Sequence, residues 1–432
     1  RQNQPSSSST FNNPYNSLYV KLSNAKNAIS KTSVGGAEEG EYTTLGIAQG
    51  MSAYNLALFT AIFGDVPYSE AMDINLTMTP KLDSQEELYK EINRFLDEAL
   101  INLPKGDRFG IANYDLLYNG NVDKWIKFAN GLKARYTMRL LHVAADKNAA
   151  LKAVVDYANK SFTSASEEAA FNVYNAQNLN PLFDFQWSRD GLAASRSLAD
   201  KFIERNDPRL DRNFTTAKWD QVTGLKAGTP TYNLLAENGK NDQVQYKYLT
   251  STFVFAQTAS TQLLSFHEVL FLKAEALQRL GESSSTIEPI LKAAVKAAIV
   301  NSENSVEAAF VAPTVKEYGG IIEKSADITD AQVEAYFTKS VKPLFQANAL
   351  KEIVNQKYLA FSGASGESTE MYNDIRRWKA LGENFITLKN PNRFPLRLPY
   401  GNSETTTNPN VQAAYGNGQY VYSEQVWWAG GN

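Results

Sequence analysis

Apolar side chains recur along most of this chain with the spacing of amphipathic helices. The pattern is clearest in residues 84–103 and 123–143, where apolar positions lie three or four residues apart and therefore share one helical face. The first segment carries its apolar face on Leu88, Ile92, Phe95, Leu96, Ala99 and Leu103. The second carries Trp125, Phe128, Ala129, Leu132, Tyr136, Leu140 and Val143, with lysines and arginines on its opposite face. Both segments are predicted to be helices packed on a core.

Residues that start and stop helices support further predictions. A helix over residues 48–63 is expected to end at Gly64, because glycine terminates helices readily and Pro67 follows closely. Ser84 with Glu87, and Thr329 with Gln332, have capping-box spacing, and Gly281 is a candidate C-cap. Further helices are predicted over 192–205, 261–280, 286–301, 330–337, 342–361 and 370–380.

Long polar stretches separate these helices. They cover residues 65–83, 162–190, 214–254 and 389–432, and loops of this length are usually functional or packed against the body. Short strands such as 244–249 are expected within them. The paired helices favour an all-α fold with a TPR-like α-solenoid core. One compact domain is predicted over residues 11–432, behind a flexible, serine-rich tether at residues 1–10.

Composition excludes several classes of function. The formal net charge is -3, so no basic surface favours nucleic acid as a partner. The chain has no Cys, which excludes disulfides and thiolate sites, and only two His, His142 and His267. A zinc site or a Ser–His–Asp triad therefore has little to draw on. There is no run of 18 apolar residues, so no transmembrane helix is predicted.

Several sequence blocks, taken in order, are specific enough to compare with a known family. The most specific are FGDVPYSEA (Phe63–Ala71) and DKWIKFANGLKAR (Asp123–Arg135). The others are NDPRL (Asn206–Leu210), FHEVLFLKAEAL (Phe266–Leu277), KYLAFSG (Lys357–Gly363), EMYNDIRRW (Glu370–Trp378), RFPLRLPYGNSE (Arg393–Glu404) and NPN (Asn408–Asn410). The ordered set resembles the SusD/RagB family of outer-membrane nutrient-binding lipoproteins, and most closely the SusD-like family 2.

The resemblance implies a helical, TPR-like lipoprotein on the cell surface of a Bacteroidetes-type bacterium. It implies an N-terminal lipid anchor in the outer membrane, which is expected upstream of Arg1 because this sequence has no Cys. It also implies a partner, a SusC-like TonB-dependent transporter, for which the lipoprotein acts as a lid. The cargo is expected to be an oligosaccharide, and a peptide stays open as an alternative.

Candidate ligand-binding residues are loop aromatics with polar neighbours, because an aromatic ring stacks on the apolar face of a sugar while amide and guanidinium groups bind its hydroxyls. The loop after FGDVPY has no Trp, which keeps peptide cargo open, but it offers a carboxylate and an amide. The predicted ligand-binding set is Trp187, Arg189, Trp219, Tyr232, Asp73 and Asn75.

Two other classes of protein stay open as alternatives, a helical glycoside hydrolase and a TPR-type scaffold that binds only proteins. The carboxylate pairs open to a hydrolase are Asp65 with Glu70, Glu367 with Glu370, and Asp184 with Asp190, and structural roles are expected for all of them. No cofactor is predicted. Calcium stays open as a metal, because the loops 65–73 and 238–242 are rich in oxygen ligands.

Overall fold

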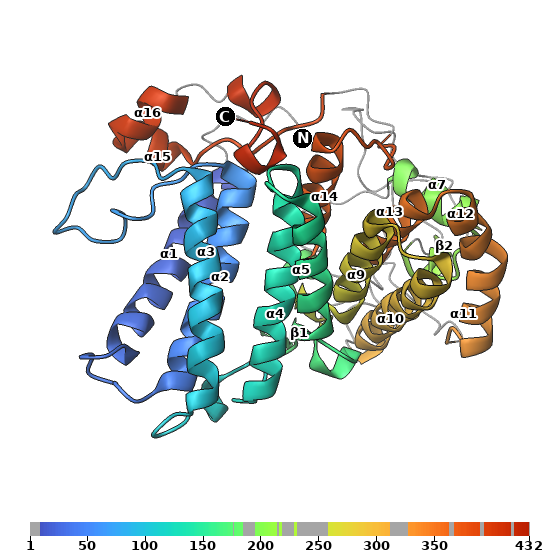
Figure 1. Cartoon of the computed structure of the whole chain (residues 1–432), viewed down its shortest axis with the longest axis horizontal. Coiled ribbons are helices and arrows are strands. Elements are labelled where there is room, and N and C mark those ends of the chain that lie inside the picture. The colour runs from blue at the N-terminus through green and yellow to red at the C-terminus, as the bar shows by residue number, and fades with distance from the viewer. Residues whose placement is uncertain are drawn as a thin grey trace. The chain divides into compact units, whose positions relative to one another are not determined.

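The computed structural model describes residues 9–175, 177–184, 195–213, 216–217, 229–230, 258–311, 327–362, 367–388, 393–415 and 419–431. The chain divides into two compact units, each assembled from separate segments (Figure 1). Unit 1 comprises Arg1–Ser161, Asn373–Glu383 and Asn392–Asn432, and unit 2 comprises Phe162–Tyr372 and Asn384–Pro391. The single domain expected over 11–432 stays a prediction. Of the expected tether, residues 9 and 10 begin the first helix.

Unit 1 is built on long antiparallel helices that succeed one another along the chain (Figure 1). They are α1 (Ser9–Thr32), α2 (Tyr42–Phe63), α3 (Gln85–Asn102), α4 (Val122–Arg139) and α5 (Lys147–Asn159). Each packs on the next or on α2, which gives the stacked hairpins of a TPR-like solenoid. Short helices α15 (Asn402–Thr407) and α16 (Pro409–Tyr415) and the 3-10 turns η9 (Gln419–Tyr422) and η10 (Trp427–Ala429) complete it.

Helix α2 is the core helix of unit 1. By length and composition it is the one helix, among the residues described, that could cross a membrane, but 72% of its apolar window is buried within the protein. Aromatic rings cover its C-terminal half: Tyr15 lies 4.9 Å from Phe59 and 5.0 Å from Phe63 between ring centroids, in edge-to-face contacts. Its apolar character therefore belongs to a protein core.

Unit 2 is also mainly helical. Two small antiparallel pairs join β1 (Ala169–Phe171) to β4 (Thr261–Leu264) and β2 (Thr216–Ala217) to β3 (Thr229–Pro230). Its helices are α7 (Arg196–Glu204), α8 (Leu210–Asn213), α9 (Phe266–Leu280), α10 (Ser284–Val311), α11 (Asp330–Tyr336), α12 (Lys342–Ala347), α13 (Ala349–Ala360) and the start of α14 (Ser368–Ala380). A π-helical turn, Phe337–Val341, joins α11 to α12.

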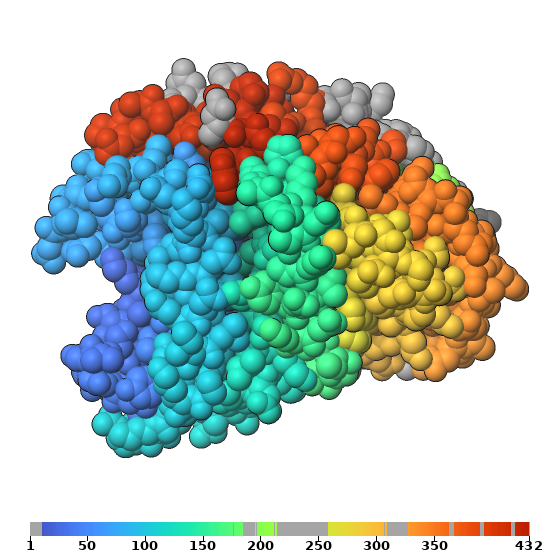
Figure 2. All heavy atoms as spheres, viewed as in Figure 1, coloured from blue at the N-terminus to red at the C-terminus, as the bar shows by residue number. Residues whose placement is uncertain are grey.

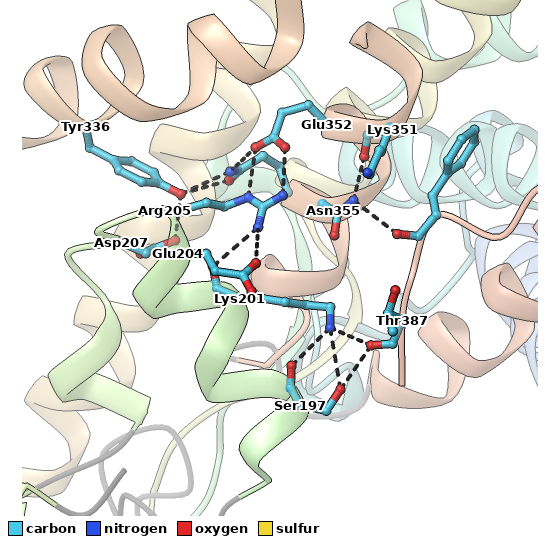
Figure 3. Close-up of polar contacts among 12 residues, drawn as sticks. Ser197, Lys201, Glu204, Arg205, Asp207, Tyr336, Lys351, Glu352, Asn355 and Thr387 are labelled. Atoms are coloured by element: carbon cyan, nitrogen blue, oxygen red, sulfur yellow. Dashed lines mark hydrogen bonds and ion pairs between the residues drawn. The ribbon is translucent and has the colours of Figure 1, made fainter. Parts of the chain in front are cut away.

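A buried ion pair ties the C-terminal end of α7 to α13 in unit 2 (Figure 3). The Arg205 guanidinium donates to both carboxylate oxygens of Glu352, at 3.1 and 2.8 Å, and both side chains are buried. Gln356 donates to the same carboxylate at 2.8 Å. Nearby, the Tyr336 hydroxyl donates to Asp207 at 2.8 Å. These groups are matched to one another inside the unit and are therefore structural.

Most predicted helices are confirmed, including their caps. Ser84 and Thr329 each form the full capping box with Glu87 and Gln332. Gly281 ends α9 in the left-handed conformation, at φ 81°. The all-α, TPR-like fold class predicted from the sequence is therefore correct.

Other boundaries were wrong. Residues 261–264 form strand β4, and α9 begins only after the cap Ser265. The helix predicted over 342–361 is broken at Asn348, which adopts an extended backbone and caps α13 by accepting from the Lys351 N–H at 3.0 Å. Helices α1, α5, α8, α15 and α16 were not predicted. In α1 and α5 the signal was present and was missed, since buried apolar residues recur at helical spacing, such as Leu18 with Leu22 and Leu151 with Val154.

Removing the Glu352 carboxylate is expected to destabilise the protein. Glu352→Ala leaves the Arg205 guanidinium buried without its partner, which costs about 3–5 kcal/mol of unfolding free energy. Urea unfolding measures the loss. Lys90→Ala is the control, because Lys90 pairs with Glu86 in solvent at 2.8 Å, and no measurable change is expected there. Equal effects of the two variants would contradict the structural role of the buried pair.

Candidate functional site

The loop of residues 64–83 begins where α2 ends, at Gly64. Its φ of 87° is accessible mainly to glycine, and a Cβ there would lie 2.7 Å from Nη2 of Arg397. The Arg397 guanidinium donates to the Phe63 carbonyl and, at 2.7 Å, to the Tyr400 hydroxyl. Tyr400 in turn donates to the Asp65 carbonyl. Gly64 is therefore needed both for the turn and for the close approach of this arginine.

The far end of the loop is fixed by the Asp83 carboxylate. One oxygen accepts the N–H groups of Tyr68 and Ser69, both at 2.8 Å, and the other accepts the Ser69 hydroxyl at 2.5 Å. Val66 and Asp83 also form an antiparallel bridge. These contacts hold the first and last residues of the loop together at its base.

The flanks of the loop are held by other parts of unit 1. Tyr19 of α1 donates to the Pro67 carbonyl at 2.7 Å, and Lys26 of α1 donates to the Ala71 carbonyl at 3.3 Å. Asn408 and Asn410 donate to the carbonyls of Pro80 and Thr79, each at 2.8 Å. The tip between these anchors extends from the body (Figure 1).

A cavity of about 630 Å³ lies between this loop, α1, α2 and α3. In Figure 2 the surface is hollowed below the loop, beside α1. The volume is that of a typical small-ligand site. We name this cavity the loop cavity; its lining is Lys26, Ile29, Ser52, Tyr68, Ser69, Met72, Lys81, Leu82, Asp83, Glu87, Leu88, Glu91, Arg94 and Phe95.

The charged side chains of the lining comprise three cations and three anions, and each of them is engaged within unit 1. Arg94 binds Glu91 through two N–H groups and also pairs with Glu98. Lys81 pairs with Glu70 at 3.3 Å, and Glu87 caps α3 by accepting from Ser84. The wall has no net formal charge, so it does not favour an ionic ligand.

Tyr68 is the polar aromatic residue of the lining. Burial, followed by the nearby Glu91 carboxylate, raises its pKa well above the ordinary value, although Arg94 opposes the shift. Tyr68 is therefore neutral at any physiological pH, and its ring and hydroxyl are suited to stacking and hydrogen bonding.

The loop tip carries two of the six predicted ligand-binding residues. Asp73 and Asn75 lie close together, because the Asp73 carboxylate accepts the Asn75 N–H at 3.0 Å, and both are exposed. They follow Met72, which lines the loop cavity with a backbone φ of 63°. Three apolar side chains alternate with them and are also exposed, Ile74 (83%), Leu76 and Met78 (86%). The tip is thus an exposed, partly apolar lip beside the cavity.

The other four predicted residues, Trp187, Arg189, Trp219 and Tyr232, lie outside the described residues. Their role in binding stays a prediction. So does calcium binding at residues 238–242, which also lie outside. In the part of the chain that the structure describes, no group of three His, Cys, Asp or Glu residues could hold a metal ion.

The carboxylates considered for hydrolysis have structural partners where they are described. Asp65 accepts the Gln85 N–H at 2.8 Å, and Glu70 accepts the Lys81 N–H at 3.1 Å. Glu367 accepts the Ser265 N–H at 2.6 Å at the start of α9. These contacts stabilise turns and helix ends, as expected from the sequence.

A family profile described as starch-binding proteins associating with the outer membrane, SusD-like 2, matches residues 3–400. The chain belongs to the SusD-like 2 family. No curated protein matches it. A SusD/RagB family protein of Bacteroides thetaiotaomicron has a crystal structure that is 49% identical, with a TM-score of 0.91, and the match covers 100% of this chain and 90% of that one.

More distant structures share the fold. A chitin-binding protein is 23% identical with a TM-score of 0.72, over 96% of this chain and 87% of its own. A chitin-binding SusD homologue from Flavobacterium johnsoniae is 21% identical with a TM-score of 0.67, over 99% and 89%. The resemblance to the SusD/RagB family that the sequence indicates is therefore confirmed. The family is one of nutrient-binding proteins associated with the outer membrane.

Sequence reasoning missed most of the loop cavity. Lys26 and Ile29 lie on α1, a helix that was not predicted. The sequence does show that Glu87, Glu91 and Arg94 share one face of a predicted helix, because they recur at helical spacing. Charged residues in this pattern are, however, equally typical of a helix face that is exposed to solvent. The sequence does not reveal that the loop of residues 64–83 lies over this face of α3, so the cavity between them could not be predicted.

Removing the Asp83 carboxylate is expected to release the base of the loop. Asp83→Ala deletes the acceptor of three hydrogen bonds, which costs about 2–3 kcal/mol and exposes residues 64–83 to proteases. Limited proteolysis and urea unfolding measure both effects. Asp73→Ala, which removes a single exposed acceptor at the tip, is the matched control and is expected to leave both unchanged. Unaltered proteolysis of Asp83→Ala would show that the clamp is dispensable.

Proposed function

We propose that this SusD-like 2 protein captures an oligosaccharide at the cell surface and delivers it to a SusC-like TonB-dependent transporter, acting as its lid. The family description supports an outer-membrane nutrient-binding protein. Surface exposure and a lipid anchor on the outer membrane are part of the proposal.

The observation that carries the choice of cargo is the neutral wall of the loop cavity. Its cations and anions are equal in number, and Arg94 and Lys81 are already ion-paired with Glu91 and Glu70. The ring of Tyr68, together with Phe95 and Met72, supplies apolar contact. A glycan without charge can stack on such a wall and exchange hydrogen bonds with its rim. A charged peptide would have to break existing pairs such as Arg94 with Glu91 before it gained new ones.

The proposed role is non-enzymatic. Of the carboxylates considered for hydrolysis, Asp65, Glu70 and Glu367 each already accept a backbone N–H. Such groups serve as fixed acceptors. Incubation with a panel of glycans is expected to yield no new reducing ends, and turnover would favour the hydrolase instead.

The first test concerns Tyr68. Tyr68→Ala removes a ring from the cavity wall and is expected to weaken binding of starch- or chitin-derived oligosaccharides about tenfold, while Tyr68→Phe retains the stack and most of the affinity. Isothermal titration calorimetry measures this. Lys90→Ala lies on the solvent side of α3 and serves as the unaffected control. A panel that includes neutral and charged peptides separates the two cargo classes, and binding of peptides alone would overturn the glycan proposal.

The second test concerns the predicted loop aromatics, Trp187 and Trp219. A stack that removes roughly 100 Å² of apolar surface from water is worth about 2.5 kcal/mol. Trp187→Ala or Trp219→Ala is therefore expected to abolish measurable glycan binding by a protein of micromolar to millimolar affinity. Circular dichroism spectra control for folding. If both variants bind as the wild type does, Trp187 and Trp219 are not ligand-binding residues.

A further inference from the structure

A second exposed surface lies at one end of the helices α1–α4. The loop of residues 64–83, which covers the loop cavity, lies at their other end. At the exposed surface, the turn between α1 and α2 meets the connection between α3 and α4 (Figure 1). Phe109 is 77% exposed and Tyr114 84%. We name this surface the aromatic end; its exposed large apolar residues are Val34, Ile101, Phe109, Tyr114 and Leu116.

The backbone beneath these rings is held firmly. The Glu41 carboxylate accepts the Phe109 N–H at 3.2 Å, and Glu41 forms an antiparallel bridge with Asp107. Asp107 accepts the N–H and hydroxyl of Thr44, at 3.0 and 2.8 Å. Asp115 accepts the indole N–H of Trp125 at 2.7 Å. The exposed side chains are therefore presented by a preorganised support, which lowers the entropy lost on binding.

The aromatic end has no excess of positive charge. Its exposed ionic side chains in residues 31–41 and 103–123 are three cations and three anions, namely Lys31, Lys105, Arg108, Glu38, Glu39 and Asp123. The other carboxylates of these ranges, Glu41, Asp107 and Asp115, accept internal hydrogen bonds. Nucleic acid or an anionic membrane surface would favour an excess of positive charge. Exposed rings on a surface without that excess match a neutral glycan, whose apolar ring faces stack on aromatic side chains.

One face of α3 connects this surface to the loop cavity. Glu91 and Arg94 line the cavity, Glu98 pairs with Arg94, and Ile101 belongs to the aromatic end. These positions are three or four residues apart, so they form a single stripe along the helix. The rise from Arg94 to Ile101 is about 10 Å. A ligand chain that leaves the cavity along α3 reaches the aromatic end after two helical turns.

We propose that Phe109 and Tyr114 form a second contact surface for the same glycan chain that occupies the loop cavity. This inference rests on the proposed function, since it assumes a glycan cargo. It adds that the protein selects for chain length: a short oligosaccharide fills the cavity alone, whereas a long chain engages both surfaces and gains affinity through effective concentration.

The test compares the double variant Phe109→Ala/Tyr114→Ala with the wild type. The probes are maltotriose and chitotriose as short ligands, and soluble amylopectin and long chitooligosaccharides as long ones, in calorimetry and affinity electrophoresis. The double variant is expected to bind the short probe as the wild type does and to bind the long probe about tenfold more weakly. Val20→Ala, an exposed apolar residue of α1 away from both surfaces, is the control.

The outcomes separate the inference from the proposed function. If the wild type binds no glycan probe, the proposed function and the inference both fail. If the wild type binds and the folded double variant retains full affinity for the long probe, only the inference fails. Unchanged glycan binding combined with loss of a co-purified transporter would assign the aromatic end to a protein partner and would also overturn it.

Discussion

The carbonyl groups at the end of α2 are the constraint on which the rest of unit 1 depends. The last four carbonyls of any helix lack intrahelical partners, and here they lie in the core, where an unpaired carbonyl is costly. Thr60 accepts from the Gly64 N–H, and Ile62 from the Leu398 N–H, at 2.8 and 3.0 Å. Arg376 donates to Ala61 at 2.6 Å, and Arg397 donates to Phe63. Three of these four carbonyls are satisfied by groups more than 300 residues away in sequence.

This arrangement explains why the C-terminal part of the chain folds back onto its beginning. Arg376 and Arg397 bring two buried positive charges to the negative end of the α2 dipole, where they are electrostatically favoured. The Arg397 guanidinium carbon lies 4.6 Å from the ring centroid of Tyr415 and 5.0 Å from that of Tyr420, so aromatic faces replace part of its lost hydration. The direction in which the chain leaves Gly64, and with it the position of the loop cavity, is set by these contacts.

How much of this the sequence reveals depends on the range of each interaction. Capping boxes and glycine stops are local, so Ser84 with Glu87 and Gly281 were predicted correctly. The arginines near the C-terminus carry no such local signal, and the role of Arg376 and Arg397 at the end of α2 requires the fold. Lys26 likewise could not be assigned to a cavity, because its contact with the Ala71 carbonyl depends on how the loop folds onto α1. The paired helical segments and the resemblance to the SusD-like family both indicated the fold class, whereas the cavity depends on how one exposed loop lies on α1 and α3.

The distribution of charge explains how such a protein could hold cargo without retaining it. In unit 2 buried charges are consumed by partners such as Arg205 and Glu352, and in the loop cavity the pairing of Arg94 with Glu91 has the same effect. No strong ionic contact is then left for a ligand at these groups, so binding rests on stacking and on hydrogen bonds that water can replace. Two or three stacks of about 2.5 kcal/mol each are largely offset by an association cost of at least about 4 kcal/mol. Stacking alone therefore gives an affinity no tighter than about millimolar, and hydrogen bonds have to supply any further gain. Under the proposed function, weak binding of this kind would favour transfer, because a bound chain dissociates quickly and can leave without breaking a buried ion pair.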